Sequence, residues 1–332
     1  HVVDFPFNPH YHIPSQRLSY LTQTPGISYE EDDIVALVRE QKIDLIVLSA
    51  LRSGVIATVE RLARKVPLPP RVMIDGEDDA HIRRELFRTS GSSLYFKREY
   101  RWHRERGFRG RIERWREFKS NNYVFERVHP LPFAIVQETI PSIGNLPKDV
   151  DISYVARASH AKRIKAVRLL RASKSVRFRG GLYAVGEDRQ SKLLTGIPRL
   201  LAKLKGDPYV TPAQLGEKLS SSDYIALLQR SKMALSIRGG GFDTLRDWEI
   251  VASRTLLISE EPDICIPNNF VHGEHAIFCK PDLSDLIELV QTYARDEKTC
   301  AVMAEAGHAH LLKYHTCERR GEYFFELCRR YI

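Results

Sequence analysis

The sequence has little of what marks several classes of protein. Its five cysteines are odd in number and none forms a C-x-x-C pair. This argues against a disulfide framework and a zinc site, and it favours a reducing compartment, the cytoplasm. No apolar run approaches the roughly 20 residues that a membrane-spanning helix needs, and no internal repeat is present. We therefore expect a globular protein whose 332 residues are enough for two domains.

Acidic residues are also in deficit. The chain has 42 Asp and Glu against 51 Lys and Arg, which gives a formal charge of +9. The excess indicates an anionic partner, such as a nucleotide, a phosphorylated acceptor, nucleic acid or a membrane surface. An ordinary solvated basic surface explains the same numbers, and composition does not separate the two.

The basic residues are densest at 97–119, "KREYRWHRERGFRGRIERWREFK". Ten Lys or Arg and four Glu give this tract a local charge of +6, and aromatic residues lie between them. Such a tract can hold an anionic glycan acceptor, contact membrane headgroups at the inner face, or bind nucleic acid, the least favoured of the three. It can also be an exposed basic helix and loop.

Short apolar runs alternate with amphipathic helical patterns along both halves of the chain. This alternation predicts an α/β fold with buried parallel sheets. The expected strands are residues 43–51, 71–76, 93–99, 128–136, 151–157, 176–184, 233–237, 255–259 and 276–280. The expected helices are residues 53–66, 78–89, 160–173, 222–232, 243–254, 282–296, 298–315 and 317–332.

Residues 137–151, "QETIPSIGNLPKDVD", interrupt the alternation and read as a linker. We expect two Rossmann-like lobes with a cleft between them, an N-terminal acceptor lobe over 1–140 and a C-terminal lobe over 151–316. The final helix, 317–332, carries an apolar stripe that needs a partner, and we expect it to return to the N-terminal lobe.

Three consecutive glycines, Gly239, Gly240 and Gly241, separate an expected strand from an expected helix. Glycine lets backbone approach a ligand closely, and the free N–H groups of a helix N-terminus favour an anion. Asp243 is placed as the helix N-cap. Arg246 and Glu249 follow on one face of the helix. A glycine turn with an intrahelical ion pair between these two is the alternative.

The stretch "ALSIRGGGFDTLRDWEIVASRTLLIS" and the later "HGEHAIFCKPDLSDL" resemble the C-terminal domain of GT-B glycosyltransferases, in particular the branch of the spore-maturation-protein glycosyltransferases. The resemblance covers the second half of the chain. It implies that Glu249 grips the ribose of a nucleotide sugar, next to Gly239–Gly241, Asp243 and Thr244. A first glutamate that the family often has falls at Gly241 here, so the resemblance carries over no role for that glutamate.

The segment "DISYVARASHAKRIKAV", residues 151–167, is similar to the opening of the same domain. The resemblance implies that Arg157, Lys162 and Arg163 meet the pyrophosphate of the donor. It also implies that no catalytic metal and no cofactor are needed, the donor being a UDP- or GDP-sugar. His10 and His12 form a lone H-x-H, which is weak support for a metal site.

The acidic motif "DGEDD", residues 75–79, follows an expected strand. Asp75, nearest the strand end, is the first choice for a general base acting on an acceptor hydroxyl. The motif could also hold a cation or be an ordinary acidic helix start.

Together with these patterns, the resemblance implies a glycosyltransferase that moves a sugar from a nucleoside diphosphate to a hydroxyl acceptor. Arg246, with Arg157, would stabilise the departing diphosphate. A non-catalytic nucleotide- or nucleic-acid-binding protein of the same fold is the alternative.

Overall fold

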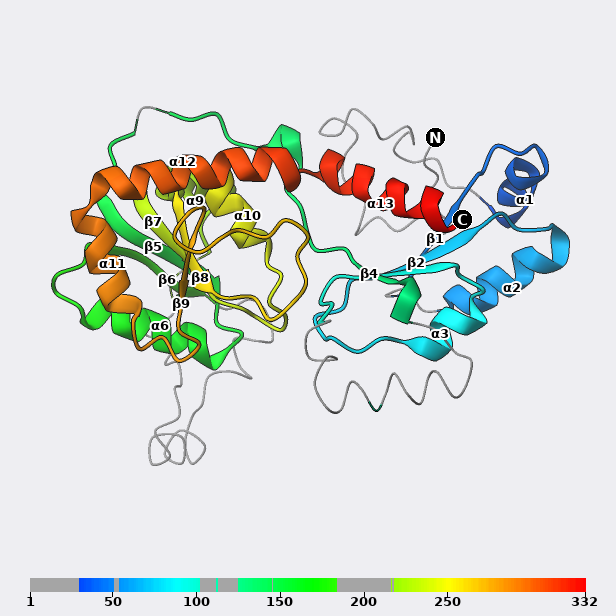
Figure 1. Cartoon of the computed structure of the whole chain (residues 1–332), viewed down its shortest axis with the longest axis horizontal. Coiled ribbons are helices and arrows are strands. Elements are labelled where there is room, and N and C mark those ends of the chain that lie inside the picture. The colour runs from blue at the N-terminus through cyan, green and yellow to red at the C-terminus, as the bar shows by residue number, and fades with distance from the viewer. Residues whose placement is uncertain are drawn as a thin grey trace. The chain divides into compact units, whose positions relative to one another are not determined.

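The computed structural model describes residues 30–50, 54–101, 112, 125–144, 146–183, 216 and 218–332. The chain forms two compact units, each built on a parallel sheet (Figure 1). Unit 1 comprises His1–Pro132, Val136–Thr139 and Gly321–Ile332, and unit 2 comprises Phe133–Ile135 and Ile140–Arg320. The predicted α/β fold class with parallel sheets is confirmed.

Unit 1 contains a four-stranded parallel sheet in the order β1-β2-β3-β4. Its strands are β1 (Ile46–Ser49), β2 (Arg71–Asp75), β3 (Leu94–Lys97) and β4 (Val128–Pro130). Its helices are α1 (Glu31–Arg39), α2 (Val55–Lys65) and α3 (Arg84–Thr89), and short 3-10 turns occur at η2 (Phe125–Arg127) and η3 (Gln137–Thr139).

The apolar residues of the strands build the core of unit 1. Val72, Leu94 and Phe96 are buried and pack with Phe324 and Cys328. The last two belong to α13 (Cys317–Tyr331), most of which lies in unit 1. The Phe96 and Phe324 ring centroids are 4.6 Å apart. The C-terminal segment is therefore part of the unit 1 core.

Two elements of unit 1 differ from the sequence-based prediction. Helix α1 was not expected. Its first turn, Glu31–Asp33, is charged, and its buried apolar face consists of only Ile34 and Val35. Helix α3 begins at Arg84 rather than residue 78. The acidic residues before α3 are used in the loop instead: Asp79 accepts the His81 N–H at 2.8 Å and therefore does not cap a helix there.

Unit 2 contains a five-stranded parallel sheet in the order β6-β5-β7-β8-β9. Its strands are β5 (Val150–Arg157), β6 (Phe178–Tyr183), β7 (Ser231–Ser236), β8 (Leu256–Glu260) and β9 (Ile277–Cys279). Its helices are α6 (Ala161–Ala172), α9 (Ser221–Arg230), α10 (Leu245–Ala252), α11 (Leu286–Arg295) and α12 (Glu297–Tyr314). The predicted strands and helices of this half are found, with ends moved by a few residues.

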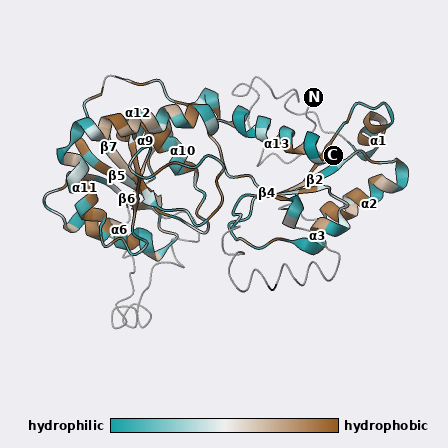
Figure 2. Ribbon diagram, in the orientation of Figure 1, coloured by the Kyte–Doolittle hydropathy of each residue, from teal (hydrophilic) through white to brown (hydrophobic). Residues whose placement is uncertain are grey.

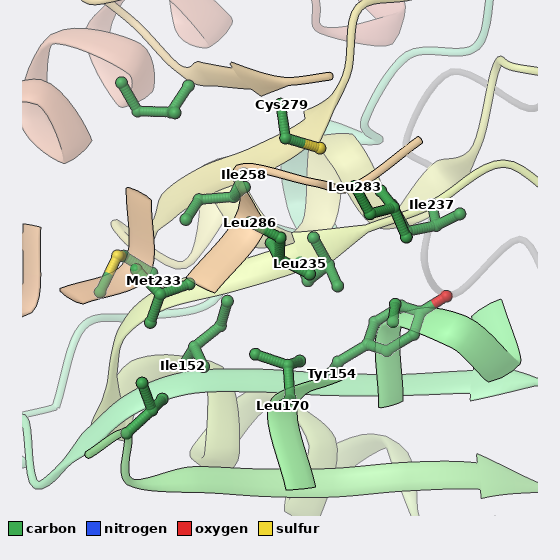
Figure 3. Packing of buried hydrophobic residues seen from close by; sticks show 14 of the residues in the cluster. Ile152, Tyr154, Leu170, Met233, Leu235, Ile237, Ile258, Cys279, Leu283 and Leu286 are labelled. Atoms are coloured by element: carbon green, nitrogen blue, oxygen red, sulfur yellow. The ribbon is translucent and has the colours of Figure 1, made fainter. Parts of the chain in front are cut away.

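Both faces of the inner strands are buried, so β7 and β8 are buried along their whole length and carry apolar residues on both faces. On one face Ile152, Tyr154 and Leu235 pack with Leu170 of α6 and Leu286 of α11 (Figure 3). The opposite face contributes alternate strand residues to a second cluster with α9, α10 and α12, which comprises Leu228, Ala234, Trp248, Ile250, Val251, Leu257 and Leu311. In Figure 2 the helices around the sheet carry both hydrophobic and hydrophilic residues, as this arrangement requires.

The topology determines which loops meet. Strands β5 and β7 are neighbours, with Ile152 opposite Met233, although β6 and α9 lie between them in the chain. Parallel strands end at the same edge of a sheet. The β5–α6 loop, the β7–α10 loop and the end of β8 are therefore brought to one edge, where ligands of open α/β sheets bind.

Candidate functional site

Arg163 ties together the two loops at the carboxyl edge of the unit 2 sheet. Its Nε donates to the carbonyls of Ile237 and Arg238, both at 3.0 Å. Its Nη1 donates to the Arg157 carbonyl at 3.0 Å and to Ser159 Oγ at 2.9 Å. The side chain is 6% exposed. Arg163 was expected to meet a pyrophosphate, but these four donations give it the role of a clamp between the β5–α6 and β7–α10 loops.

The clamp explains one of the three glycines. A Cβ on Gly239 would lie 3.0 Å from Arg163 Nη2 and 3.5 Å from Ser159 Oγ. Among the described residues the glycines with positive φ are Gly54, Gly91, Gly180 and Gly273, and Gly239 is not one of them. Close approach of the Arg163 and Ser159 side chains, rather than a left-handed backbone, is thus the reason for glycine at position 239.

Asp243 does not cap α10, contrary to the prediction. The N-cap is Thr244, and the buried Asp243 carboxylate accepts the backbone N–H of Phe133 at 2.6 Å. Phe133 is 110 residues away in the chain, so the local pattern gave no sign of this contact. Asp243 anchors the segment Phe133–Ile135 to the base of the glycine loop.

Thr244 begins α10 with a small hydroxyl network. Its Oγ1 lies 3.1 Å from Ser236 Oγ, at the end of β7, and 3.2 Å from Asp247 Oδ1. Burial raises the pKa of Asp247 to about 6, although hydrogen bonds from Ser236 and Thr244 and the charge of Arg246 oppose the shift. The start of α10 therefore holds a carboxyl group that titrates near neutral pH.

Arg246 lies against the sheet. Its Nε donates to the Val155 carbonyl at 3.1 Å, and its guanidinium carbon is 5.7 Å from the centre of the Tyr154 ring. Its Nη1 is buried, and within the described residues no hydrogen-bond partner faces it. Arg246 was expected to face the departing diphosphate. The structure turns its Nε to the floor of the site and leaves Nη1 available.

Glu249 follows on the same helix and is half-buried. Burial raises its pKa, while the charge of Arg246 and the hydroxyl of Tyr224 on α9 act in the opposite direction. No ion pair joins Arg246 to Glu249 in the part of the chain that the structure describes. The simple intrahelical pair considered from the sequence is thus not formed, and Glu249 retains its acceptor oxygens.

The remaining predicted cations lie at the ends of β5 and α6. Arg157 is the exposed last residue of β5. Lys162, in the first turn of α6, forms an ion pair with Glu260, the buried last residue of β8. The same carboxylate accepts the Arg238 N–H through Oε1 at 3.3 Å. Sequence reasoning missed Glu260, because an acidic residue after a strand gives no sign of burial.

Arg238 was also missed. It begins the glycine loop, and its guanidinium carbon is 4.7 Å from the centre of the Phe242 ring. Its Nε is buried without a hydrogen-bond partner among the described residues. The edge therefore gathers cations from three segments: Arg157 and Lys162, Arg238, and Arg246.

Asp75, the expected base, ends β2 in unit 1 and has no exposed surface. Its Oδ2 accepts hydrogen bonds from Arg83 Nη1 at 2.5 Å and from the Tyr95 hydroxyl, and it lies 3.0 Å from Lys97 Nζ. Its Oδ1 accepts the Glu77 N–H at 3.0 Å. A base must face the hydroxyl that it deprotonates. The geometry does not provide that face, and Asp75 instead anchors Arg83 and Lys97.

Several other predictions concern residues that the structure does not describe. His10, His12 and most of the basic tract 97–119 lie outside the described residues. Among those described, no group of His, Cys, Asp or Glu is arranged to hold a metal ion. No described helix has both the length and the apolar character needed to cross a bilayer.

Comparison with known proteins finds a family resemblance in the second half of the chain and a shared fold over most of it. Residues 189–326 match a family model described as glycosyl transferase-like. No curated protein matches the sequence. Among solved structures, a glycosyltransferase from Rickettsia africae ESF-5 superposes with a TM-score of 0.53 at 12% identity, covering 90% of this chain and 79% of that chain.

Two further structures share the fold. HepE of Anabaena, in complex with UDP, gives a TM-score of 0.56 at 11% identity and covers 90% of this chain and 82% of its own. TarM of S. aureus gives 0.52 at 11% identity, and the match spans 91% of this chain but 58% of TarM. The spore-maturation branch stays a prediction. The second half of the chain is therefore similar to glycosyl transferase-like proteins, and the chain shares its fold with solved glycosyltransferases.

Proposed function

We propose that the protein transfers a sugar from a nucleoside diphosphate to a hydroxyl acceptor and that the carboxyl edge of unit 2 binds the donor. The observation that carries this proposal is the meeting of the glycine loop and the cations Arg157, Lys162 and Arg238 at one sheet edge, where α10, the helix that carries Glu249, begins. Such an edge suits a ligand with hydroxyls at one end and two phosphates at the other.

Each group has a role that follows from its chemistry. The Glu249 carboxylate accepts hydrogen bonds from the ribose hydroxyls. The N–H groups of Gly240, Gly241 and Thr244, with Arg157 and Lys162, face the diphosphate. The buried Nη1 of Arg246 adds positive charge beneath it. Arg163 and Asp243 fix the two loops and do not contact the donor.

The reaction breaks the bond between the sugar carbon and the diphosphate oxygen and forms a bond from that carbon to the acceptor oxygen. The electron pair of the broken bond goes to the diphosphate, where the cations stabilise the new charge. Because protein cations supply this stabilisation, we propose that no metal is required. Asp75 takes part as a positioning residue for Arg83 and Lys97, and the acceptor proton leaves to another base or to solvent.

Calorimetry with UDP and GDP tests the donor site. Glu249→Ala removes a charge-assisted hydrogen bond of about 1.5–3 kcal/mol, which weakens nucleotide binding by about ten- to a hundredfold. Glu288→Ala, which removes an exposed carboxylate from α11, is the matched control and leaves the affinity unchanged. Equal affinities of the wild-type protein and Glu249→Ala, with the fold intact, would show that the ribose site lies elsewhere.

Slow hydrolysis of UDP- and GDP-sugars tests the reaction and its metal requirement. We expect release of the diphosphate, with the same rate in the presence of EDTA. A rate that disappears with EDTA and returns with Mg²⁺ or Mn²⁺ would refute metal independence while leaving transferase activity in place. Nucleotide binding without hydrolysis or transfer would favour a non-catalytic nucleotide-binding protein, and absence of both would favour the nucleic-acid-binding alternative.

The proposals for the acceptor and for the cellular compartment are based on the sequence. We propose that the protein acts in the cytoplasm and that the basic tract 97–119 binds an anionic glycan acceptor. Charge reversal of Arg104, Arg106 and Arg109 should lower transfer to the acceptor, with a weaker salt dependence, and leave nucleotide affinity unchanged. Transfer that stays unchanged and insensitive to salt would mean that the tract is only surface. Binding of the tract to RNA or to anionic vesicles in place of a glycan would name another partner.

A further inference from the structure

Glu260 is a buried carboxylate at the carboxyl edge of the unit 2 sheet, 5% exposed at the end of β8. Burying a carboxylate costs several kcal/mol unless the charge is paired and hydrogen-bonded. A position at the end of a core strand needs no charge for packing. The presence of Glu260 there therefore requires an account of what the charge does.

The contacts of Glu260 join three chain segments that are far apart in sequence. Its Oε2 pairs with Lys162 Nζ in the first turn of α6. Its Oε1 accepts the Arg238 N–H at 3.3 Å, where β7 passes into the glycine loop. One carboxylate thus connects the end of β8 to the first turn of α6 and to the start of the glycine loop.

The ion pair with Glu260 leaves Lys162 able to donate hydrogen bonds to a ligand. An ammonium group has three N–H donors, and among the described residues Glu260 is the hydrogen-bond partner of Lys162 Nζ. The Lys162 side chain is 25% exposed, whereas that of Glu260 is 4% exposed. The carboxylate therefore lies on the inner side of the ammonium group, and the outer side is open to a ligand.

We propose that Glu260 is a positioning residue for the donor site: it holds Lys162 and the start of the glycine loop where the diphosphate binds. The inference rests on the proposed function, since it assigns Lys162 to the diphosphate. A free lysine loses rotamer entropy when it binds a phosphate. The ion pair with Glu260 fixes the side chain before the ligand arrives, so that less of this entropy is lost on binding.

The test compares Glu260→Gln with Glu261→Gln, a neighbouring exposed carboxylate that serves as the matched control. Glutamine can still accept the Arg238 N–H but has no charge to hold Lys162. We expect Glu260→Gln to weaken UDP binding about tenfold and to leave uridine binding, which involves no phosphate, unchanged. Glu261→Gln leaves both affinities unchanged. Glu260→Asp, which keeps the charge on a shorter side chain, is expected to be intermediate.

A double-mutant cycle separates positioning from general damage. If Glu260 acts through Lys162, the double variant Glu260→Gln, Lys162→Met binds UDP no more weakly than Lys162→Met alone. Additive losses, or an equal loss of uridine binding, would overturn the proposal. Unchanged UDP affinity in Glu260→Gln, with the wild-type protein binding UDP, would overturn it as well.

Chemical labelling of Lys162 distinguishes failure of this inference from failure of the proposed function. A paired ammonium reacts slowly with acetic anhydride, so Glu260→Gln should speed acetylation of Lys162 several-fold, measured by peptide mass spectrometry. Acetylation of Lys298, exposed on α12, should not change. Unchanged labelling of Lys162 refutes the pair in solution. Faster labelling, in a protein that binds neither UDP nor pyrophosphate, would keep the pair but refute both its role in binding and the assigned donor site.

Discussion

Replacing Arg163 by methionine tests whether the site is built on a clamp between two loops. Methionine keeps most of the buried length of the side chain but none of the four hydrogen bonds to Ile237, Arg238, Arg157 and Ser159. A hydrogen bond from a charged donor contributes about 1.5–3 kcal/mol, and removing one partner of a buried ionic network costs about 3–5 kcal/mol. Water can reach part of these loops, so we expect a loss of about 3 kcal/mol in the free energy of unfolding of unit 2.

Urea denaturation followed by far-UV circular dichroism measures this loss. At a typical slope of about 1–3 kcal/mol per molar urea, the midpoint of the unit 2 transition falls by about 1 M or more. Arg168→Met, on the exposed face of the same helix, is the matched control and should stay within about 0.5 kcal/mol of the wild type. Arg163→Lys keeps the charge without the planar fork and should lose about half as much as methionine. If Arg163→Met and Arg168→Met were equally stable, the clamp reasoning would be refuted.

Three further predictions concern groups whose surroundings are equally specific. Burial raises the pKa of Asp247 to about 6, so the ionised carboxylate destabilises the folded state. Asp247→Asn should therefore raise the free energy of unfolding by roughly 2–3 kcal/mol at pH 8 and by almost nothing at pH 4. An equal gain at both pH values in urea titrations would contradict this sign. Asp75→Asn removes the nearer carboxylate from Lys97, which has no exposed surface and keeps only Asp79 at 3.7 Å among the described residues. The variant should destabilise unit 1 by about 3–5 kcal/mol in the same assay, and a loss below about 1 kcal/mol would mean that the pair with Asp75 is not formed. A Cβ on Gly307 would lie 2.5 Å from a backbone oxygen, whereas a Cβ on Gly321 would meet nothing within 4 Å. Gly307→Ala should therefore lower the free energy of unfolding by about 1–3 kcal/mol, and Gly321→Ala should raise it by about 0.5–1 kcal/mol. Melting temperatures that move in the same direction in the two variants would refute the comparison.

Predictions from the local sequence pattern were confirmed where the residues of a single helix or strand are enough to determine its structure. The run "MALSI" predicts a buried strand because every residue is apolar or small, and β7 is buried along its length. Helix α1, by contrast, was missed, because its first turn is charged and its apolar face is too short to show a helical periodicity in the sequence. Local pattern also put Asp75 at a strand end, where it is found.

The errors arise from partners that lie far away in the chain. Asp243 has the composition and position of an N-cap, yet Phe133 takes its carboxylate. Glu260 looks like an exposed acid in "ISEEPD", yet Lys162, 98 residues earlier, makes it a buried ion-pair partner. Asp75 was given an active role because the sequence cannot show that Arg83, Tyr95 and Lys97 surround it. Roles that depend on which strands become neighbours could not be predicted from spacing alone.

The packing of α13 on the strands of unit 1 has a consequence for how the chain acquires its structure during synthesis. The core of unit 1 is made of Val72, Leu94 and Phe96 from early in the chain and of Phe324 and Cys328 from its last turns. Unit 2 is thus inserted into unit 1, and its own residues are all made before that core can close. Domains usually fold in the order in which they leave the ribosome. Here the later unit is expected to reach its native state first, while the early strands wait with an apolar surface exposed to chaperones.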